Sequence, residues 1–463
     1  MAPNDDDVIR REPPGPYRSN HWWEEGHEDD RVQRKIQQVR MIQQAFEEAG
    51  RPVGISPSDD RPEDMDYMYE RGVVLARDED ADRVQRALGL DPTWDKTQMH
   101  PEVDRSSDDV QADYEPVAPL SVSGLSRVSL PSPPTQHDFP DDTLFWLDRL
   151  DRTLGVGVAV PNHVVHISGT GGGCPANEPL PSAGGPQPSM NQDPDASGRG
   201  VKVVVIDSGI IAQVRDEHPW LAGVTGEAEP AGVRHYRDHG TFIAGVLRTM
   251  APSAEVDVKA FYDIDGATLE DDLAVRLERA LEETPDIISM SAGTTTRVGG
   301  PLLALQNFWE RRLSKVKGTV LVAAAGNDGG RGPFYPAAFP WCISVGALDE
   351  DGARAPYSNF GSWVDVYARG SRVVNAYPRG WYQYEQAPFT GEWTNFVVGM
   401  ASWDGTSFAT PLVSGLIAAR MSWSGESARV AADALLALAH ERARAEVGAV
   451  LEPGMASKPA ERT

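Results

Sequence analysis

The chain has 463 residues, of which 40% are hydrophobic, enough for a sizeable core and for two or three domains. Its 69 acidic and 43 basic side chains give a formal net charge of −26. Nucleic-acid binding and attachment to an anionic membrane both need clustered Lys and Arg, and because no such run occurs, the charge balance argues against both functions.

The two cysteines, Cys174 and Cys342, are too few for a disulfide framework or a zinc site of the usual ligand count. Cys342 lies in WCISVGAL, a predicted buried strand. The N-terminus is acidic and lacks an apolar signal region, and there is no run of about 18 apolar residues. We therefore expect a cytoplasmic protein without a transmembrane helix, with export by a non-standard route as the alternative.

The N-terminal part of the chain contains several predicted elements. Residues 1–28 are charged and Pro-rich and are predicted to be disordered. Residues 29–170 are predicted to form a helix at 29–49, which Gly50 ends, and a small α/β module. Within residues 66–170 the pattern is strand, helix, strand, helix and a final strand or hairpin, which favours a ferredoxin-like arrangement.

Residues 171–200 are rich in Gly, Pro and Ser without periodicity, which is typical of a linker or surface loop. The GTGGG run at its start lacks the Lys-Ser/Thr ending and the following helix of a phosphate-binding loop. We therefore predict no nucleotide site here.

After Gly200 the pattern changes to buried apolar strands that alternate with helices. VKVVVIDSG, EVDVKAFYD, DIISMSAG, TVLVAAAGN and WCISVGAL are predicted strands, with helical segments between several of them. This alternation predicts an α/β fold with a doubly wound, mostly parallel sheet flanked by helices. The predicted domain spans residues 201–425 and includes an apolar helix at 405–421. Residues 426–463 are predicted to form a C-terminal helix and tail.

Candidate functional residues follow the predicted strands, where ligands bind in open α/β sheets. Asp207 ends VVVIDSG, Asn327 ends VLVAAAGN, and His239 opens the helical DHGTFIAGVL. Ser407 lies in GTSFATP, at the start of the long apolar helix. Each residue alone is more typical of a turn or a helix cap. Together they supply an acid, a base, a nucleophile and an oxyanion donor in one sheet.

On these residues the chain resembles the subtilisin-like serine proteases. The matching segments are VIDSG, HGTFIAG, SMSAG, AAAGN and GTSFATP, in the expected order, over roughly residues 200–425. The resemblance implies a serine endopeptidase with Asp207, His239 and Ser407 as the triad, in the acid, base, nucleophile order that subtilisin itself exemplifies. It also implies that Asn327 donates its side-chain amide to the oxyanion.

The resemblance further implies a substrate-binding strand and a pocket wall. Ser291, Ala292 and Gly293 would pair with an extended peptide, and Ala325 and Gly326 would line the pocket beside the scissile bond. The polypeptide substrate is the expected partner. The chemistry requires no cofactor, and structural calcium sites, which occur in related proteins, cannot be assigned to residues here.

The sequence departs from the family pattern in three places. One is YARG at residues 367–370, where the family typically has an Ala-Pro-Gly turn. HGTFIAG has Phe242 where the family usually has a second, non-triad histidine. The stretch between Asn327 and Ser407 is longer than in compact members, and we assign the extra length to residues 379–402. This aromatic-rich insert would either rim the cleft and select substrates or form a surface hairpin without that role.

Three alternatives to a subtilisin-like protease stay open at this point. A non-catalytic binding protein on the same fold would be indicated by an altered triad, and none is altered. An esterase with the same nucleophile is disfavoured because the G-x-S-x-G motif is absent. The related sedolisins replace the histidine base by a carboxylate, whereas His239 favours the subtilisin branch.

For the N-terminal region we weigh two hypotheses. It is either a pro-region that blocks the cleft, in which case removing residues 1–199 should raise peptidase activity, or a permanent adaptor. In the second case the 29–49 helix would dock a partner, and the chain would remain uncut during long incubation.

Overall fold

A parallel β-sheet organises the chain after Gly200 in this computed structural model, which describes residues 28–90, 124–167, 177–230, 236–262 and 264–457. The strand order is β13-β12-β11-β10-β6-β8-β7, and each neighbouring pair is parallel. The strands are β6 (Lys202–Asp207), β7 (Thr225–Gly226), β8 (Glu255–Ala260), β10 (Ile287–Met290), β11 (Val320–Ala324), β12 (Cys342–Leu348) and β13 (Val366–Arg369). The predicted doubly wound sheet is confirmed.

Helices cover both faces of this sheet because successive side chains of a buried strand point in opposite directions. Val203 and Val205 of β6 join the hydrophobic cluster of α6 (His239–Met250), α9 (Thr406–Ser424) and α10 (Ala428–Glu441). Val204 and Ile206 join the cluster of α7 (Glu270–Glu282) and α8 (Leu303–Arg311). The short α5 (Ala212–Glu217) follows β6. The predicted apolar helix at 405–421 and the predicted helix within residues 426–463 correspond to α9 and α10.

The N-terminal region forms an antiparallel sheet with helices. The helices are α2 (Glu28–Glu48), α3 (Asp78–Ala87) and α4 (Asp142–Leu154), and the strands are β1 (Val53–Ser56), β2 (Tyr67–Arg77), β3 (Leu125–Ser129) and β4 (Ala159–His166). The predicted strand–helix–strand–helix–strand pattern is thus confirmed by β2, α3, β3, α4 and β4. The sheet has the order β1-β2-β4-β9, with β3 beside β2. Its last strand, β9 (Ala267–Leu269), comes from the later part of the chain.

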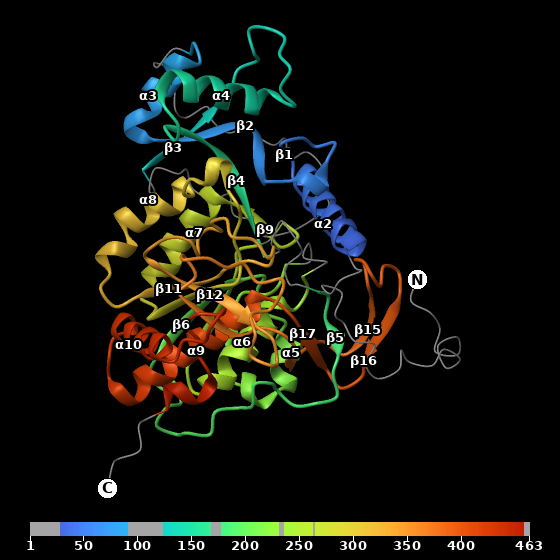
Figure 1. The fold of residues 1–463 in the computed structure, drawn as a ribbon, viewed down its shortest axis with the longest axis vertical. Helices are drawn as coiled ribbons and strands as arrows, with labels where there is room; N and C mark the ends of the chain where they lie inside the picture. The colour runs from blue at the N-terminus through green and yellow to red at the C-terminus, as the bar shows by residue number, and fades with distance from the viewer. Residues whose placement is uncertain (1–27, 91–123, 168–176, 231–235, 263, 458–463) are drawn as a thin grey trace.

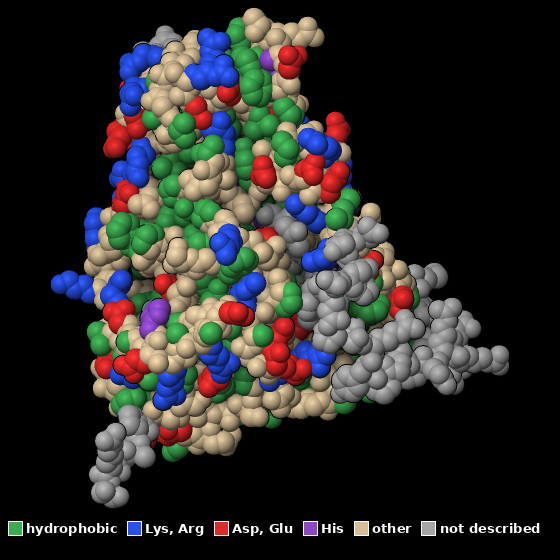
Figure 2. Space-filling model, viewed as in Figure 1, with side chains coloured by type: hydrophobic (Ala, Val, Ile, Leu, Met, Phe, Trp, Pro, Cys, Tyr) green, Lys and Arg blue, Asp and Glu red, His purple; other side chains and the backbone are tan. Residues whose placement is uncertain are grey.

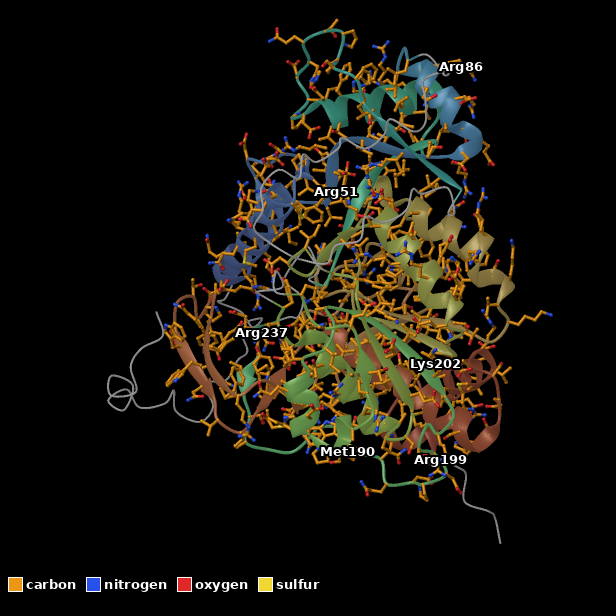
Figure 3. All side chains as sticks on the ribbon, turned by 180° about the vertical axis from the view of Figure 1, so that it is seen from behind. Arg51, Arg86, Met190, Arg199, Lys202 and Arg237 are labelled. Atoms are coloured by element: carbon orange, nitrogen blue, oxygen red, sulfur yellow. The ribbon has the colours of Figure 1, made fainter. Side chains whose placement is uncertain are left out.

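The N-terminal sheet lies against one end of the larger unit, beside α7 and α8 (Figure 1). Arg86 of α3 marks the far end of the N-terminal region, whereas Met190 and Arg199 lie at the opposite end of the molecule (Figure 3). Leu75, Leu125, Val165 and Ile167 are buried in the same hydrophobic cluster as residues of α7 and α8. The two regions therefore share a core.

The segment predicted as a linker, 171–200, is described from Asn177 onward. It contains β5 (Leu180–Pro181), which pairs with β17 (Met400–Trp403), and β17 pairs in turn with β14 (Val373–Ala376). In the predicted insert at 379–402, β15 (Gly380–Gln383) and β16 (Trp393–Phe396) form an antiparallel hairpin. Gln386, in the loop of this hairpin, accepts a hydrogen bond of 3.1 Å from the Gln38 side chain of α2.

Acidic and basic side chains are interspersed over the face seen in Figure 2. None of the described helices is long and apolar enough to cross a membrane. Cys342 is buried in β12 as a free thiol, while Cys174, the GTGGG run and residues 1–27 lie outside the described part of the chain. No cluster of three or more metal-ligating side chains occurs among the described residues.

Candidate active site

Asp207 and His239 lie at the carboxyl end of the sheet and are hydrogen-bonded to each other. Asp207 is the last residue of β6, and His239 is the first residue of α6. The distance from His239 Nδ1 to Asp207 Oδ1 is 2.8 Å, and both side chains are fully buried. His239 Nε2 is buried and has no hydrogen-bond partner among the described residues. This arrangement fixes the imidazole and leaves its second nitrogen available to take a proton.

Ser208 connects Asp207 to the start of the helix that carries His239. Its amide donates to Asp207 Oδ1 at 2.8 Å, and its hydroxyl accepts from the Gly240 amide at 3.2 Å. A Cβ at position 240 would lie 2.2 Å from the Gly209 carbonyl oxygen. Glycine is therefore required at position 240, directly after His239, because only glycine lets α6 approach the loop after β6 this closely.

Two further residues with carboxyl groups, Glu229 and Asp238, lie next to Ser208 and His239. Glu229 Oε1 accepts from the Asp238 amide at 2.6 Å and from the Ser208 hydroxyl at 3.1 Å. Asp238 precedes His239 with a left-handed φ of 68°, which is uncommon outside glycine. Burial raises the pKa of Glu229 to about 7 and, together with Glu229, raises the pKa of Asp238 well above its usual value. The Glu229 carboxylate thus links the Ser208 side chain to the backbone immediately before His239.

Ser407 lies in the first turn of α9, among aromatic rings that also contact His239. Gly405 is the N-cap of this helix, and Ser407 is buried. The rings of Trp403 and Phe408, which flank Ser407 in sequence, have centroids 5.5 and 5.6 Å from the His239 ring. The structure thus places the serine turn beside the base. Phe242, the departure from the family pattern, packs against Phe408 with 5.0 Å between ring centroids.

Asn327 is held in one amide orientation by Thr406. Asn327 Oδ1 accepts from the Thr406 amide at 2.9 Å and from the Thr406 hydroxyl at 2.8 Å. Because two donors face the oxygen, the amide nitrogen must point elsewhere. The Gly326 amide donates to the same hydroxyl at 3.2 Å. These bonds connect the end of β11 to the serine turn and orient Asn327 as a donor.

The predicted substrate strand follows β10 and adjoins the same turn. The Ser291 hydroxyl donates to the Ser407 carbonyl at 2.8 Å, and Ala292 is buried beside it. A Cβ at position 293 would lie 2.3 Å from the Phe334 ring, so Gly293 cannot carry a side chain without a shift. Ala325 and Gly326 continue from β11, and their carbonyl oxygens accept from Asn359 at 2.8 and 3.0 Å. All five predicted substrate-binding residues therefore lie around Ser407 and Asn327.

The end of β4 occupies the edge next to Gly293. His166 and Gly293 exchange backbone hydrogen bonds of 3.2 and 3.1 Å, and the Ile167 amide donates to the Gly266 carbonyl at 2.8 Å. On its other side, β4 pairs antiparallel with β9, with Val165 opposite Thr268. His166 is buried, and burial lowers its pKa to about 3. The N-terminal region thus inserts an extended segment between β9 and the predicted substrate strand.

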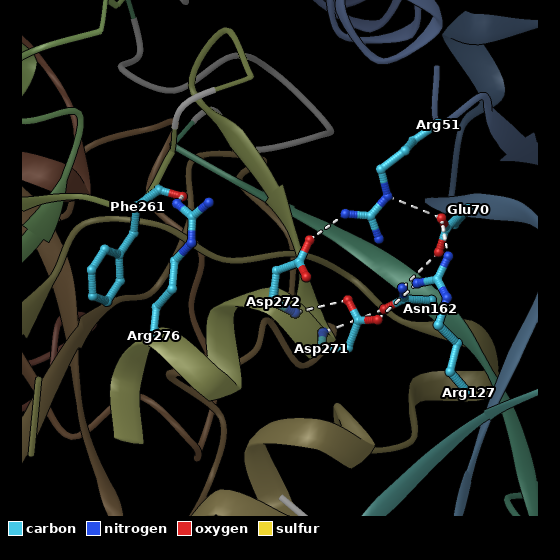
Figure 4. A network of polar contacts seen from close by, with 8 residues as sticks. All are labelled: Arg51, Glu70, Arg127, Asn162, Phe261, Asp271, Asp272 and Arg276. Atoms are coloured by element: carbon cyan, nitrogen blue, oxygen red, sulfur yellow. Dashed lines mark hydrogen bonds and ion pairs between the residues drawn. The ribbon is translucent and has the colours of Figure 1, made fainter. Parts of the chain in front are cut away.

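A buried network of ion pairs attaches the N-terminal region to the first turn of α7 (Figure 4). Arg127 pairs with Glu70 and with Asp271 at 2.9 Å, and Arg51 pairs with Glu70 and Asp272. Burial alone would raise the pKa of Glu70, but the two arginines lower it below its usual value. Arg51 lies where the N-terminal sheet meets the larger unit (Figure 3). The first turn of α7 is therefore neutralised by arginines from the other region.

Sequence reasoning missed several residues that shape the site. Thr406 and Ser208 belong to the motifs that identify the triad, so their positions gave a local signal for a supporting role. Asp238 immediately precedes His239 in the DHGTFIAGVL segment, but nothing there indicated its role, and Glu229 and His166 gave no signal because their partners are fixed by the tertiary structure alone.

Comparison with protein-family models finds that the model described as the subtilase family matches residues 198–443. Thermitase from Thermoactinomyces vulgaris is 31% identical over 251 residues, which cover 50% of this chain and 78% of thermitase. Subtilisin E from Bacillus subtilis (strain 168) is 33% identical over 246 residues, which cover 49% of this chain and 56% of that relative.

Similar solved structures include the patellamide maturation protease PatA, with 26% identity and a TM-score of 0.44 over 56% of this chain and 96% of PatA. A cold-adapted subtilisin-like serine proteinase is 21% identical, with a TM-score of 0.40 over 52% of this chain and 83% of that protein.

Proposed function

We propose that Asp207, His239 and Ser407 are the catalytic acid, base and nucleophile of this chain, which belongs to the subtilase family of serine-type endopeptidases. The observation that carries this assignment is the 2.8 Å contact between His239 and Asp207, with Nε2 of the buried imidazole left without a partner among the described residues. A serine hydroxyl is a poor nucleophile at neutral pH and needs such a base.

In this mechanism Ser407 Oγ attacks the carbonyl carbon of the scissile peptide bond while His239 Nε2 takes its proton. Asp207 accepts from Nδ1–H and stabilises the imidazolium that forms. The oxyanion is stabilised by the side-chain amide of Asn327 and the backbone N–H of Ser407. The imidazolium returns the proton to the leaving amine, and water then hydrolyses the acyl-enzyme by the same steps.

We further propose that the N-terminal region is an inhibitory pro-region. Its support is the pairing of His166 with Gly293 and of Ile167 with Gly266, the edges between which an extended substrate would lie. While β4 is held there, a substrate cannot form the same backbone hydrogen bonds. The extended segment at the end of β4 is therefore the part of the N-terminal region that would block substrate binding.

Incubation of the full-length protein beside the Ser407→Ala variant tests both proposals. We expect a fluorophosphonate probe to label Ser407 in the parent, and intact mass to show cleavage between Ile167 and Asn177 in the parent only. Labelling should increase as the cut form accumulates. An unlabelled parent would refute the triad assignment. A parent that is labelled at once but remains uncut would refute the pro-region and favour the permanent adaptor.

A further inference from the structure

The segment just upstream of the family match is attached through one residue, Asn177, to the turn at residues 403–407. We call this turn, which carries Ser407, the nucleophile turn. Its side-chain amide donates to Asp404 Oδ2 at 2.6 Å, and its Oδ1 accepts from the Asp404 amide at 3.0 Å. Its backbone carbonyl accepts from Trp403 Nε1 at 2.7 Å. Asn177 therefore bonds both residues that lead into Gly405-Thr406-Ser407.

Asp404 depends on these bonds because it is a fully buried carboxyl group. Burial raises its pKa to about 6, and the Arg372 amide and the Asn177 side chain are the donors that favour its charged form. An unpaired buried carboxylate is costly, so loss of either donor should displace the side chain or the backbone that carries it. The next three residues of the turn include Thr406, which orients Asn327, and Ser407 itself.

Neighbouring residues hold Asn177 in place. Glu178 is buried, and its carboxylate accepts from Tyr382 Oη at 2.8 Å and from the Glu385 and Gln386 amides at 3.0 Å each. Leu180 and Pro181 then pair with β17, two to three residues before Asp404. Residues 177–181 are thus bound to the insert hairpin, to β17 and to the nucleophile turn, although the family match begins at residue 198.

We propose that Asn177 is a positioning residue for the nucleophile turn and that residues 177–181 belong to the catalytic unit. The inference rests on the proposed role of Ser407. From the sequence, removal of residues 1–199 was expected to raise peptidase activity. That truncation would, however, take away Asn177 together with the inhibitory β4. Such a truncation should impair the nucleophile turn rather than simply activate the enzyme.

The test uses full-length protein and exchanges the two hydrogen-bonding side chains. Asn177→Asp removes the donor and places two carboxylates together. Asp404→Asn leaves one acceptor oxygen for two donors, the Arg372 amide and the Asn177 side chain, so each single variant loses a hydrogen bond at position 404. The double variant, Asn177→Asp with Asp404→Asn, restores an amide–carboxylate pair and leaves an acceptor for the Arg372 amide. Gln192→Ala is the matched control, because among the described residues that side chain bonds only the Met190 carbonyl.

The primary readout is hydrogen exchange of the amides at 403–408, which does not depend on catalysis. We expect each single variant to exchange about tenfold to a hundredfold faster there, with β12 unchanged, and the double variant and Gln192→Ala to match the parent. Fluorophosphonate labelling of Ser407 should fall in the single variants and recover in the double variant. Unchanged exchange in the single variants, or no recovery in the double variant, would overturn the proposal. Absence of labelling in the parent would count against the catalytic assignment, while exchange would still decide the role of Asn177.

Discussion

At the scale of single residues, the hydroxyl of Thr406 is the contact on which the proposed oxyanion hole most depends. It donates to Asn327 Oδ1 at 2.8 Å and accepts from the Gly326 amide at 3.2 Å. One hydroxyl therefore orients the donor amide and satisfies a buried N–H group at the end of β11. Loss of this hydroxyl would affect both the orientation of Asn327 and the hydrogen bonding of the Gly326 amide.

Thr406→Val keeps the shape of this side chain and removes its hydroxyl. We expect acylation of Ser407 by a fluorophosphonate to slow about tenfold, or about 1.4 kcal/mol, because Asn327 can then rotate. The unsatisfied Gly326 amide should lower the free energy of unfolding by about 1–3 kcal/mol. Thr406→Ser keeps the hydroxyl and serves as the control. Equal acylation rates in the valine and serine variants would show that Thr406 does not orient Asn327.

Glu229 should make stability depend on pH near neutrality. Its pKa is about 7 in the folded protein, raised by burial from an ordinary value of 4.5. The native state therefore binds more protons than the unfolded state between these values, so stability falls as pH rises through this window. The charge of Arg237 and the hydrogen bonds from the Asp238 amide and the Ser208 hydroxyl lower this pKa, whereas the charge of Asp207 raises it.

Glu229→Gln removes this titration while keeping an oxygen acceptor for Ser208 and Asp238. In the Ser407→Ala background, we expect the unfolding free energy of the Glu229 protein to fall from pH 5 to pH 8 relative to the Gln protein, by up to about 3 kcal/mol. Urea denaturation at each pH measures the difference. Parallel pH profiles for the two proteins would contradict the assignment of the titrating group to Glu229.

The triad and Asn327 could be proposed from sequence because each occurs in a short motif whose order along the chain is informative. Asp404 and Asn177 could not, because they are separated by more than two hundred residues and neither occupies a recognisable motif. Asp238 illustrates the same limit. It has a left-handed conformation where α6 closely approaches the loop after β6, an approach that the sequence does not reveal.

At the scale of elements, the interface between the N-terminal sheet and α7 contains buried ions of opposite sign. Glu70 and Asp271 are nearly inaccessible, with exposed fractions of 3% and 1%. Breaking a buried pair by removing one partner is strongly destabilising, about 3–5 kcal/mol, because a charge is left uncompensated. A substitution at this interface can therefore test the proposed inhibition without contact with the proposed triad.

Arg127→Ala leaves Glu70 with Arg51 and deprives Asp271 of its direct ion pair. We expect the N-terminal region to dissociate more readily and Ser407 to be labelled faster in full-length protein. Arg152→Ala removes an exposed ion pair with Asp148 on α4, worth about 0–1 kcal/mol, and should leave the labelling rate unchanged. Slower labelling of Arg127→Ala than of the parent would indicate that the N-terminal region supports the active site rather than blocking it.

The element types along the chain were largely predictable, because hydrophobic periodicity is a local property. The pairing of β4 with β9 was not, because it joins residues about a hundred positions apart and leaves no trace in either segment. The insert at 379–402 shows an intermediate case. Its aromatic composition indicated a structured segment, but its contact with α2 through Gln38 and Gln386 depends on the fold.

At the scale of the whole molecule, the boundary between the two regions does not coincide with a boundary between hydrophobic cores. Val165 and Ile167 of the N-terminal region share a cluster with Leu273 and Leu277 of α7. A second cluster joins α2 and β1 to Ala267 and Leu269 of β9. Two regions that share buried surface in this way are stabilised by each other.

This shared core predicts that uncut Ser407→Ala protein unfolds in a single cooperative transition. Calorimetry should give a calorimetric enthalpy equal to the van't Hoff enthalpy, because neither region can expose its side of the core alone. Once the chain is cut between Ile167 and Asn177, the link becomes bimolecular, and dilution should lower the transition temperature. Two separate unfolding transitions in the uncut variant would contradict this prediction. They would mean that the N-terminal region folds independently of the larger unit, as a permanent adaptor would.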